Sequence, residues 1–445
     1  MKKVLILGAG MVSKPIINYL LHSDFIVTVA SPMKERAEEI IDGHPLGTSV
    51  DWSMDCAGRL DEMTADHDLA VSLLPYKFHT DVAKSCLKNR KPLVTTSYVQ
   101  PGIQALDSEA KDAGVIILNE IGLDPGIDHM SAMRIIDHIH SSGGKIRKFY
   151  SLCGALPAPE AADNPLKYKF SWSPKGVILA SRNSALYLKD GKKVQIDPLY
   201  LFRDLFSVEF PGIGKLEVYP NRDSISYIDI YGIPEVSTMF RGTFRYPGWC
   251  ETLDFMKQLN LLDDSYSDYT GKTLSGFLAE RAGIENYNLR RTLINKFGLS
   301  EDSIPLLSLD FLGFFSNEKM KYGITSPFEI VSDMMVEKMS LGSHERDMVV
   351  LQHIFLASYP DGREEIIKSS MLNFGSVSTD TAIARTVALP AAIAVKLILD
   401  RKIDLAGVYR PVIPEIYNPV LNELNRYGIE MTEEYNLPEN DFPNL

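Results

Sequence analysis

The stretch VLILGAGMVSKPI, residues 4–16, indicates how the first part of the chain folds. An apolar strand pattern is followed at once by a Gly-Ala-Gly turn and then by a helical pattern, which we expect to begin near Met11. Gly8 permits the tight turn, Gly10 lets a pyrophosphate approach the backbone, and the helix directs its N–H groups at the phosphates. Ser13 stands where the common motif has its third glycine, but it is small enough to pack there. The stretch therefore predicts a dinucleotide site.

The alternation of strand and helix continues to about residue 120. Apolar strand patterns lie at residues 25–31, 68–75, 92–98 and 115–121, and helical patterns separate them. Repeated strand–helix units form a parallel sheet with helices on both faces. We therefore predict an α/β fold that begins with a Rossmann dinucleotide-binding domain.

The end of the second predicted strand bears on the choice of coenzyme. NAD-binding proteins usually place an Asp or Glu there, which binds the ribose 2′-hydroxyl. This strand ends without a carboxylate, and Ser31, Lys34 and Arg36 could hold a 2′-phosphate instead. The alternative is that both cations simply solvate a helix face. We predict NADP(H), with NAD(H) as the alternative, and we expect Asp55 and Leu74 beside the coenzyme because they follow later strands.

After residue 143 the pattern changes to the alternation typical of half-buried strands, and a mostly helical segment interrupts it. We predict a mixed-sheet α+β domain with a helical subdomain. The predicted parts are residues 1–124 for the Rossmann domain, 125–248 with 345–380 for the mixed α/β domain, and 249–344 for the helical subdomain. The carboxy-terminal segment, about residues 381–445, is expected to pack back on the first domain.

The composition excludes several classes of protein. The net charge of -12 argues against a nucleic-acid binder, which would need a basic face. The four cysteines form no C-x-x-C pair, so we expect no zinc site and no disulfide framework, but reduced thiols in the cytosol. The apolar stretch at residues 381–399 contains Arg385, Pro390 and Lys396, which favours a buried helix over a membrane span.

The stretch NEIGLDPGIDHM, residues 119–130, concentrates acids and a histidine. A metal site would need further ligands, and we find none nearby, so we predict no metal. Asp124 precedes a proline, as an N-cap residue often does. Tyr98 and Asp124 also follow predicted parallel strands, and ligands bind at the carboxyl ends of such strands. The capping and active-site interpretations are compatible, while Asp128 and His129 are predicted to be structural.

Arginines follow two later strand patterns, at Arg222, Arg241 and Arg245. The arginine fork suits bidentate binding of carboxylates, and the alternative is that these are ordinary surface residues. The segment 150–174 is broken by Pro157, Pro159 and Pro165 and has no clear periodicity, yet it retains aromatic residues such as Trp172. Long segments of this kind are often functional.

These motifs together resemble the family of saccharopine reductases, the glutamate-forming saccharopine dehydrogenases of the aminoadipate lysine pathway. The resemblance covers most of the chain and rests on LGAGMVSKP, SLLPYKFH, TTSY, GLDPGIDHM, LCGALPAPEAADNPLKYKFSWSPKGV, YPNRDS, RGTFRYPGW and ERDMVVLQH. It implies a homodimeric oxidoreductase that uses NADP(H), in which the mixed α/β domain carries the substrate and dimerisation contacts. The cysteine usage noted above predicts a cytoplasmic location. The reaction implied is hydride transfer that interconverts saccharopine with L-glutamate and L-2-aminoadipate 6-semialdehyde.

The resemblance also implies roles for single residues. Coenzyme contacts fall on Gly10, Met11, Val12, Ser31, Asp55, Leu74 and Trp172, beside the Gly8 and Lys34 inferred above. Substrate contacts fall on Tyr98, Val99, Asp124, Arg222, Thr243, Phe244 and Arg245. Asp124, Tyr98 and Cys153 are the polar groups expected to orient the amine and move protons. Two alternatives are a carboxynorspermidine or homospermidine type of dehydrogenase and a non-catalytic NADP-sensing protein.

Overall fold

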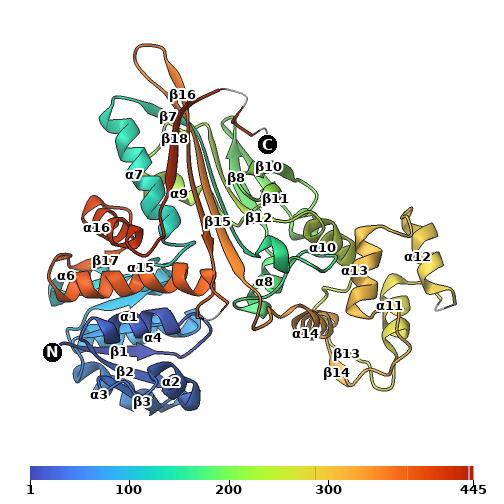
Figure 1. The fold of residues 1–445 in the computed structure, drawn as a ribbon, viewed down its shortest axis with the longest axis horizontal. Coiled ribbons are helices and arrows are strands. Elements are labelled where there is room, and N and C mark those ends of the chain that lie inside the picture. The colour runs from blue at the N-terminus through green and yellow to red at the C-terminus, as the bar shows by residue number, and fades with distance from the viewer. Residues whose placement is uncertain (286, 378, 439–440, 444–445) are drawn as a thin grey trace. The chain divides into compact units, whose positions relative to one another are not determined.

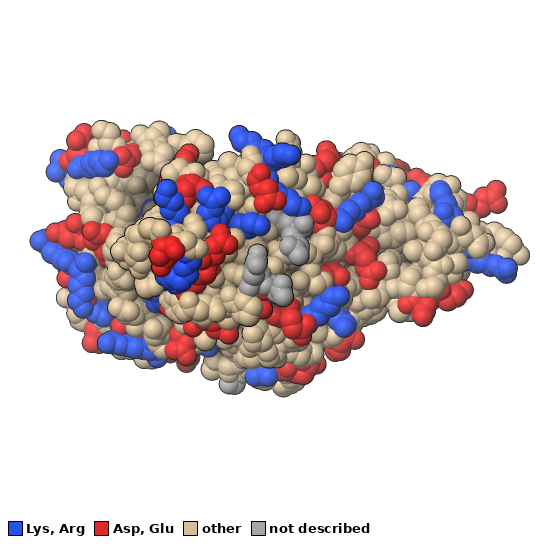
Figure 2. Space-filling model, turned by 90° about the horizontal axis from the view of Figure 1, so that it is seen from above, with Lys and Arg blue, Asp and Glu red and all other residues tan. Residues whose placement is uncertain are grey.

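The computed structural model describes residues 1–285, 287–377, 379–438 and 441–443, and of Cys56 and Ala57 it describes only the backbone (Figure 1). The chain forms two compact units. The first comprises Met1–Lys145, Ser358–Arg363 and Ser369–Glu434, and the second comprises Ile146–Ala357, Glu364–Lys368 and Tyr435–Leu445. On the face drawn in Figure 2, basic and acidic side chains are intermixed.

The first unit contains a parallel sheet with the strand order β17-β6-β5-β4-β1-β2-β3. Its strands are β1 (Lys3–Leu7), β2 (Ile26–Ser31), β3 (Gly47–Asp51), β4 (Leu69–Ser72), β5 (Leu93–Thr95), β6 (Ile116–Leu118) and β17 (Gly407–Tyr409). The central strands are buried on both faces, as their continuous apolar runs predicted. The predicted Rossmann fold is confirmed, and β17 extends the sheet with residues that the sequence patterns had not marked as a strand.

The first unit also contains helices. They are α1 (Lys14–His22), α2 (Lys34–Ile41), α3 (Ala57–Ala65), α4 (His79–Lys88), α5 (Pro101–Gln104), α6 (Asp107–Ala113), α7 (Ile127–Ser141), α15 (Ala382–Leu399) and α16 (Pro414–Asn425), with short 3-10 helices η1 (Met54–Cys56) and η2 (Tyr76–Phe78). The expected start of the first helix near Met11 is wrong. Ser13 donates its backbone N–H and its hydroxyl to the Gly10 carbonyl, which extends the turn, and Pro15 then occupies the first helical turn, where its missing N–H costs nothing.

Helix α15 is long and apolar enough to cross a membrane by length and composition alone. However, 78% of its apolar window is buried inside the protein. It packs against α1 and α16 within the same unit. This burial is typical of a core helix, as the sequence predicted.

The second sheet is mixed and has the strand order β10-β11-β12-β7-β15-β16-β18, with β8 and β9 joined beside β12. Its strands are β7 (Lys145–Pro157), β8 (Ala185–Lys189), β9 (Lys192–Ile196), β10 (Phe206–Phe210), β11 (Gly214–Pro220), β12 (Thr238–Arg245), β15 (Asp347–Ser358), β16 (Glu364–Phe374) and β18 (Thr432–Leu437). Strands β7 and β12 are parallel, whereas β10, β11 and β12 are antiparallel. The predicted mixed sheet is confirmed.

The apolar residues alternate over residues 214–233, but only the first part of this pattern forms a strand. Strand β11 ends at Pro220, and residues Ser226–Tyr231 form helix α9. The carboxylate of Asp223 accepts the backbone N–H groups of Ile225 and Ser226, which turns the chain into the helix, and Gly232 ends it with a left-handed φ of 64°. Local side-chain bonds thus override the alternating pattern.

Helices follow from residue 249, as predicted. They are α10 (Trp249–Gln258), α11 (Leu274–Ala282), α12 (Leu289–Phe297), α13 (Ile304–Leu312) and α14 (Pro327–Met339), with the short strands β13 (Ser267–Asp268) and β14 (Ile324–Thr325). Helix α8 (Pro174–Ala180) lies earlier in the chain and precedes β8.

Candidate functional site

The glycine turn after β1 is shaped to accept a ligand at the backbone. Gly8 has a φ of +109°, and an added Cβ would lie 3.2 Å from the carbonyl oxygen of Leu73. At Gly10 the Cβ position has no heavy atom of the described residues within 4 Å. Met11 and Val12, which follow, are exposed and partly exposed. One glycine is therefore needed by the fold, while the other leaves an open approach to the start of α1, where a pyrophosphate would bind.

The end of β2 carries the residues predicted to select NADP. The Ser31 side chain is buried, and its hydroxyl oxygen accepts the N–H of Met33 at 3.1 Å. Lys34 lies 3.4 Å from Glu38 on α2, and both side chains are exposed. Exposed ion pairs contribute only about 0–1 kcal/mol, so a 2′-phosphate could compete for this lysine. Arg36 makes a similar exposed pair with another acid on α2.

Asp55 and Leu74 lie where the sequence placed them, after β3 and after β4. Asp55 is exposed and lines a cavity of about 460 Å³ together with Met54, Leu60 and Phe78. Leu74 is half-buried and packs against the core of the first unit. The rest of the cavity lining is polar or charged and comprises Asp61, Asp81, Lys84, Ser85 and Lys88, so the contact of Asp55 with an adenine ring stays a prediction. Trp172 belongs to the second unit, so its contact with the coenzyme stays a prediction.

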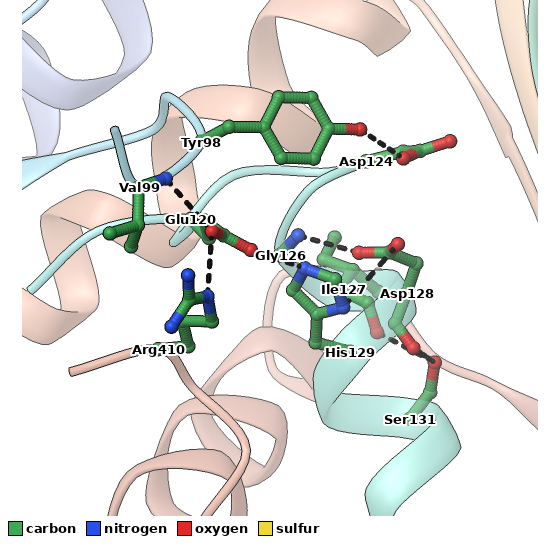
Figure 3. Close-up of polar contacts among 10 residues, drawn as sticks. All are labelled: Tyr98, Val99, Glu120, Asp124, Gly126, Ile127, Asp128, His129, Ser131 and Arg410. Atoms are coloured by element: carbon green, nitrogen blue, oxygen red, sulfur yellow. Dashed lines mark hydrogen bonds and ion pairs between the residues drawn. The ribbon is translucent and has the colours of Figure 1, made fainter. Parts of the chain in front are cut away.

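The structure brings Tyr98 and Asp124 together, one from the loop after β5 and the other from the loop after β6 (Figure 3). The Tyr98 hydroxyl donates to Asp124 Oδ1 at 3.2 Å. The expected helix cap is wrong, because α7 begins at Ile127 and its N-cap residue is Gly126. Gly126 packs so closely on Gly122 that an added Cβ would clash, and this turn separates Asp124 from the helix. The Asp124 carboxylate is thus directed to Tyr98.

A buried carboxylate lies below this pair. Glu120 is 2% exposed and has a φ of +58°. Its Oε1 accepts the N–H of Val99 and the Nε–H of Arg410, each at 2.9 Å, and its Oε2 lies 2.9 Å from His129 Nε2 (Figure 3). Burial favours the neutral acid, but the His129 and Val99 hydrogen bonds and the Arg410 charge outweigh it and hold the pKa of Glu120 below its usual value.

The remaining acid of the stretch, Asp128, bonds locally. Its Oδ1 accepts the N–H of Gly126 at 2.6 Å, and its Oδ2 lies 3.6 Å from His129 Nδ1. Asp128 and His129 are both buried. Within the described part of the chain, no group of three or more His, Cys, Asp or Glu residues is arranged to hold a metal ion.

A second buried histidine braces the neighbouring strand ends. His79 Nδ1 lies 2.8 Å from the hydroxyl of Ser72, the last residue of β4, and Nε2 lies 2.8 Å from the Ser97 hydroxyl beside Tyr98. Burial lowers the pKa of His79 to about 4. The imidazole is therefore neutral at pH 7 and can donate through one nitrogen and accept through the other.

In the second unit, the predicted residues lie on adjacent strands. Thr243 on β12 is the cross-strand neighbour of Cys153 on β7 and of Tyr219 on β11. Cys153 is a buried thiol that is 7% exposed, and Phe244 is fully buried. The register therefore places Cys153 and Thr243 side by side.

Arg245 lies at the end of β12 inside a ring of aromatic residues. Its guanidinium carbon is 5.0 Å from the ring centroid of Tyr168, 5.7 Å from that of Tyr219 and 5.5 Å from that of Trp249. Nη1 donates to the Phe244 carbonyl at 2.8 Å, whereas the buried Nε has no hydrogen-bond partner among the described residues. A buried cation with an unused N–H is suited to an anionic ligand.

Two of the three arginines are not surface residues. Arg245 and Arg241 are 4% and 3% exposed, so neither is a surface arginine. Arg241 stacks over the ring of Tyr227 at 4.2 Å. Arg222 is exposed and follows β11 with a left-handed φ of +48°.

Two residues of the site were given no role by sequence reasoning, Glu120 and Arg410. Glu120 stands within the acidic stretch, so its position was a visible signal. Arg410 is separated from it by 290 positions and carried no signal in the sequence.

Comparison with protein families gives two matches that together cover most of the chain. Residues 4–118 match the saccharopine dehydrogenase NADP binding domain, and residues 122–429 match the saccharopine dehydrogenase C-terminal domain.

Individual proteins are similar over nearly the whole chain. The saccharopine dehydrogenase (NADP+, L-glutamate-forming) of Saccharomyces cerevisiae is 39% identical, over 97% of this chain and 99% of its own length. The mitochondrial alpha-aminoadipic semialdehyde synthase of Bos taurus is 38% identical over 97% of this chain, which corresponds to 48% of that longer protein. The structure of the apo, histidine-tagged L-Glu-forming saccharopine dehydrogenase of S. cerevisiae superimposes with a TM-score of 0.91 and 37% identity, covering 98% of this chain and 100% of that chain.

Proposed function

The chain belongs to the saccharopine dehydrogenase family, and on this basis we propose that it is an NADP-linked oxidoreductase that interconverts saccharopine with L-glutamate and L-2-aminoadipate 6-semialdehyde. The observation that carries the proposal is the likeness to the yeast enzyme, which extends over 99% of that enzyme and includes its fold. The glycine turn fits the coenzyme independently, because Gly10 leaves the backbone open where a pyrophosphate would lie.

The proposed chemistry needs an anion-binding part and a proton-handling part. When bound, the coenzyme supplies the hydride acceptor, so that the secondary amine of saccharopine becomes an imine, which water opens to the two products. Saccharopine carries three carboxylates, and we assign Arg222 and Arg245 to hold them. The unused Nε–H of Arg245 supports this assignment, since a carboxylate would satisfy it. Val99, Thr243 and Phe244 are assigned to further substrate contacts.

Tyr98, Asp124 and Cys153 are assigned to the amine and its protons. The Tyr98–Asp124 hydrogen bond supports a shared role, because a carboxylate beside a phenol can accept a proton from the amine while the phenol fixes its direction. Cys153 is buried beside Thr243, and we assign it to the surroundings of the reacting carbon.

We assign Ser31 and Lys34 to the 2′-phosphate of the coenzyme. The turn that binds the pyrophosphate comprises Gly8, Gly10, Met11 and Val12. Other parts of the coenzyme are assigned to Asp55, Leu74 and Trp172. We further propose a cytoplasmic homodimer, in which residues 1–124 bind coenzyme and the segment of about 381–445 packs back on them. Residues 125–248 with 345–380 bind substrate and the partner copy, and 249–344 form a helical subdomain. Analytical ultracentrifugation tests the dimer directly.

The decisive experiment is a turnover assay with saccharopine, run with NADP+ and NAD+ in parallel and monitored by absorbance of the reduced nicotinamide. We expect turnover, with NADP+ preferred. Carboxynorspermidine in place of saccharopine tests the polyamine alternative. NADPH binding without turnover of any of these amines would favour a coenzyme-sensing protein and would contradict the proposal.

A further inference from the structure

We propose that Glu120 is a positioning residue for the reaction, and that it acts by holding Tyr98 and Asp124 in one fixed arrangement. The inference rests on the proposed function, because it concerns the pair that we assign to the substrate amine. It adds a role for a residue that does not itself belong to that pair.

Glu120 holds the chain on both sides of Tyr98. Its backbone N–H donates to the carbonyl of Ser97 at 3.0 Å, and its side-chain Oε1 accepts the N–H of Val99 at 2.9 Å. The peptide groups that flank Tyr98 are therefore bonded to one residue. Rotation of this segment would break both bonds, so the direction of the Tyr98 side chain depends on Glu120 (Figure 3).

The other oxygen of Glu120 secures the loop that carries Asp124. Oε2 bonds His129 in the first turn of α7, and the neighbouring Asp128 accepts the N–H of Gly126 at 2.6 Å. The loop is closed further by backbone bonds from Gly122 to the carbonyl of residue 125 and from Asp128 to the carbonyl of residue 123. Both partners of the Tyr98–Asp124 hydrogen bond are thus tied to the same buried carboxylate.

Arg410 supplies the balancing charge from a third segment, just after β17. It donates Nε–H to Glu120 Oε1 at 2.9 Å, and its Nη1 lies 3.4 Å from Gln104 Oε1. A buried carboxylate is stable only when it is paired and hydrogen-bonded. The arginine therefore keeps Glu120 charged, and a charged acceptor makes shorter and stronger hydrogen bonds than a neutral one.

The backbone conformation of Glu120 also supports a positioning role. A φ of +58° is disfavoured for any residue other than glycine and, less severely, asparagine or aspartate. Such conformations persist where the surrounding structure fixes them, and they are concentrated at functional sites. A residue that served packing alone would not require a charged side chain in this conformation.

A double-mutant cycle separates positioning from a merely structural role. We would measure kcat and KM for saccharopine in the wild type, Glu120→Gln, Tyr98→Phe and the double variant, and count active sites by NADPH titration. Glutamine still offers an oxygen to Val99 but cannot accept from both His129 and Arg410 as the carboxylate does. We expect Glu120→Gln to lower kcat/KM about 10- to 100-fold through misplacement of the pair, with NADPH affinity within about twofold of wild type.

In the Tyr98→Phe background, the same Glu120→Gln change should lower kcat/KM by no more than about twofold, because residues that act together are not additive. A structural role would give the same fold-loss in both backgrounds. Equal losses, or no loss from Glu120→Gln alone, overturn the inference.

Two further variants keep the test decisive if Glu120→Gln does not fold. Arg410→Gln removes the balancing charge from a side chain that is 25% exposed, and it should show the same loss of additivity with Tyr98→Phe. Arg134→Gln is the matched control, since it breaks a pair with Glu433 whose side chains are 30% and 23% exposed, and it should leave kcat/KM unchanged. Additive losses for Arg410→Gln also overturn the inference.

The two proposals fail in different ways. A wild-type protein that binds NADPH but does not turn over saccharopine refutes the proposed function, and this inference with it. A wild-type protein that turns over saccharopine, with additive losses in the cycle, refutes only the positioning role.

Discussion

Replacing each glycine of the turn by alanine should separate the stability of the fold from coenzyme binding. At Gly8 the φ of +109° is strained for any L-residue, which costs about 1–3 kcal/mol. The new Cβ would also lie 3.2 Å from a backbone oxygen of Leu73, which cannot move aside as a side chain can. We therefore expect Gly8→Ala to lower the free energy of unfolding by about 2–4 kcal/mol.

Gly10→Ala is the matched change, because it adds the same methyl group two residues away. Its φ is outside the left-handed range, and the methyl meets no described atom within 4 Å. The free energy of unfolding should change by less than about 1 kcal/mol. The methyl would instead occupy the approach of the pyrophosphate and weaken charge-assisted bonds of about 1.5–3 kcal/mol, so the Kd for NADPH should rise about 10- to 100-fold.

Urea unfolding of the two variants, followed by titration with NADPH under native conditions, gives both quantities. Tight NADPH binding by Gly10→Ala would refute the placement of the pyrophosphate at this turn. Unchanged urea stability of Gly8→Ala would refute the argument from backbone strain and the contact with Leu73.

Three other predictions concern single side chains. Burial lowers the pKa of His79 from 6.5 to about 4, so between these pH values the unfolded chain binds a proton that the folded chain does not bind. The free energy of unfolding should therefore fall by on the order of 3 kcal/mol as the pH drops from 6.5 to 4. Thermal unfolding of His79→Gln should show a smaller pH dependence over the same range. Arg245→Met should lower kcat/KM for saccharopine about 10- to 100-fold with unchanged NADPH affinity. Arg245→Lys should retain only part of the wild-type kcat/KM, because an ammonium group lacks the planar fork of the guanidinium. Normal turnover by both variants would mean that the substrate carboxylate binds elsewhere. Ser31→Asp should shift the kcat/KM preference from NADP+ towards NAD+, because the new carboxylate repels the 2′-phosphate. The carboxylate can still accept the N–H of Met33, so the local backbone should be kept. A wild-type preference for NAD+ would contradict the assignment of Ser31.

The family resemblance and the residues implied by it came from motifs that are short and local. Gly8 and Gly10 could be identified because a turn between a strand and a helix depends on a few neighbouring residues. The helix start was misplaced by three residues, since Ser13 bonds back to Gly10 and delays it. Helix α9 was missed for a similar reason, because the side chain of Asp223 begins a turn that the alternating pattern does not reveal.

The sequence by itself determined the parallel sheet of the first unit, the mixed sheet of the second and the chemical types of the candidate residues, because apolar periodicity and turn residues act over short distances in the chain. Only the tertiary structure decided which partners these residues have. Asp124 was expected to cap a helix and instead bonds Tyr98, Glu120 is paired with an arginine 290 positions away, and Arg245 is enclosed by rings from separate segments. Such contacts depend on how whole elements pack, and the local sequence does not contain that information.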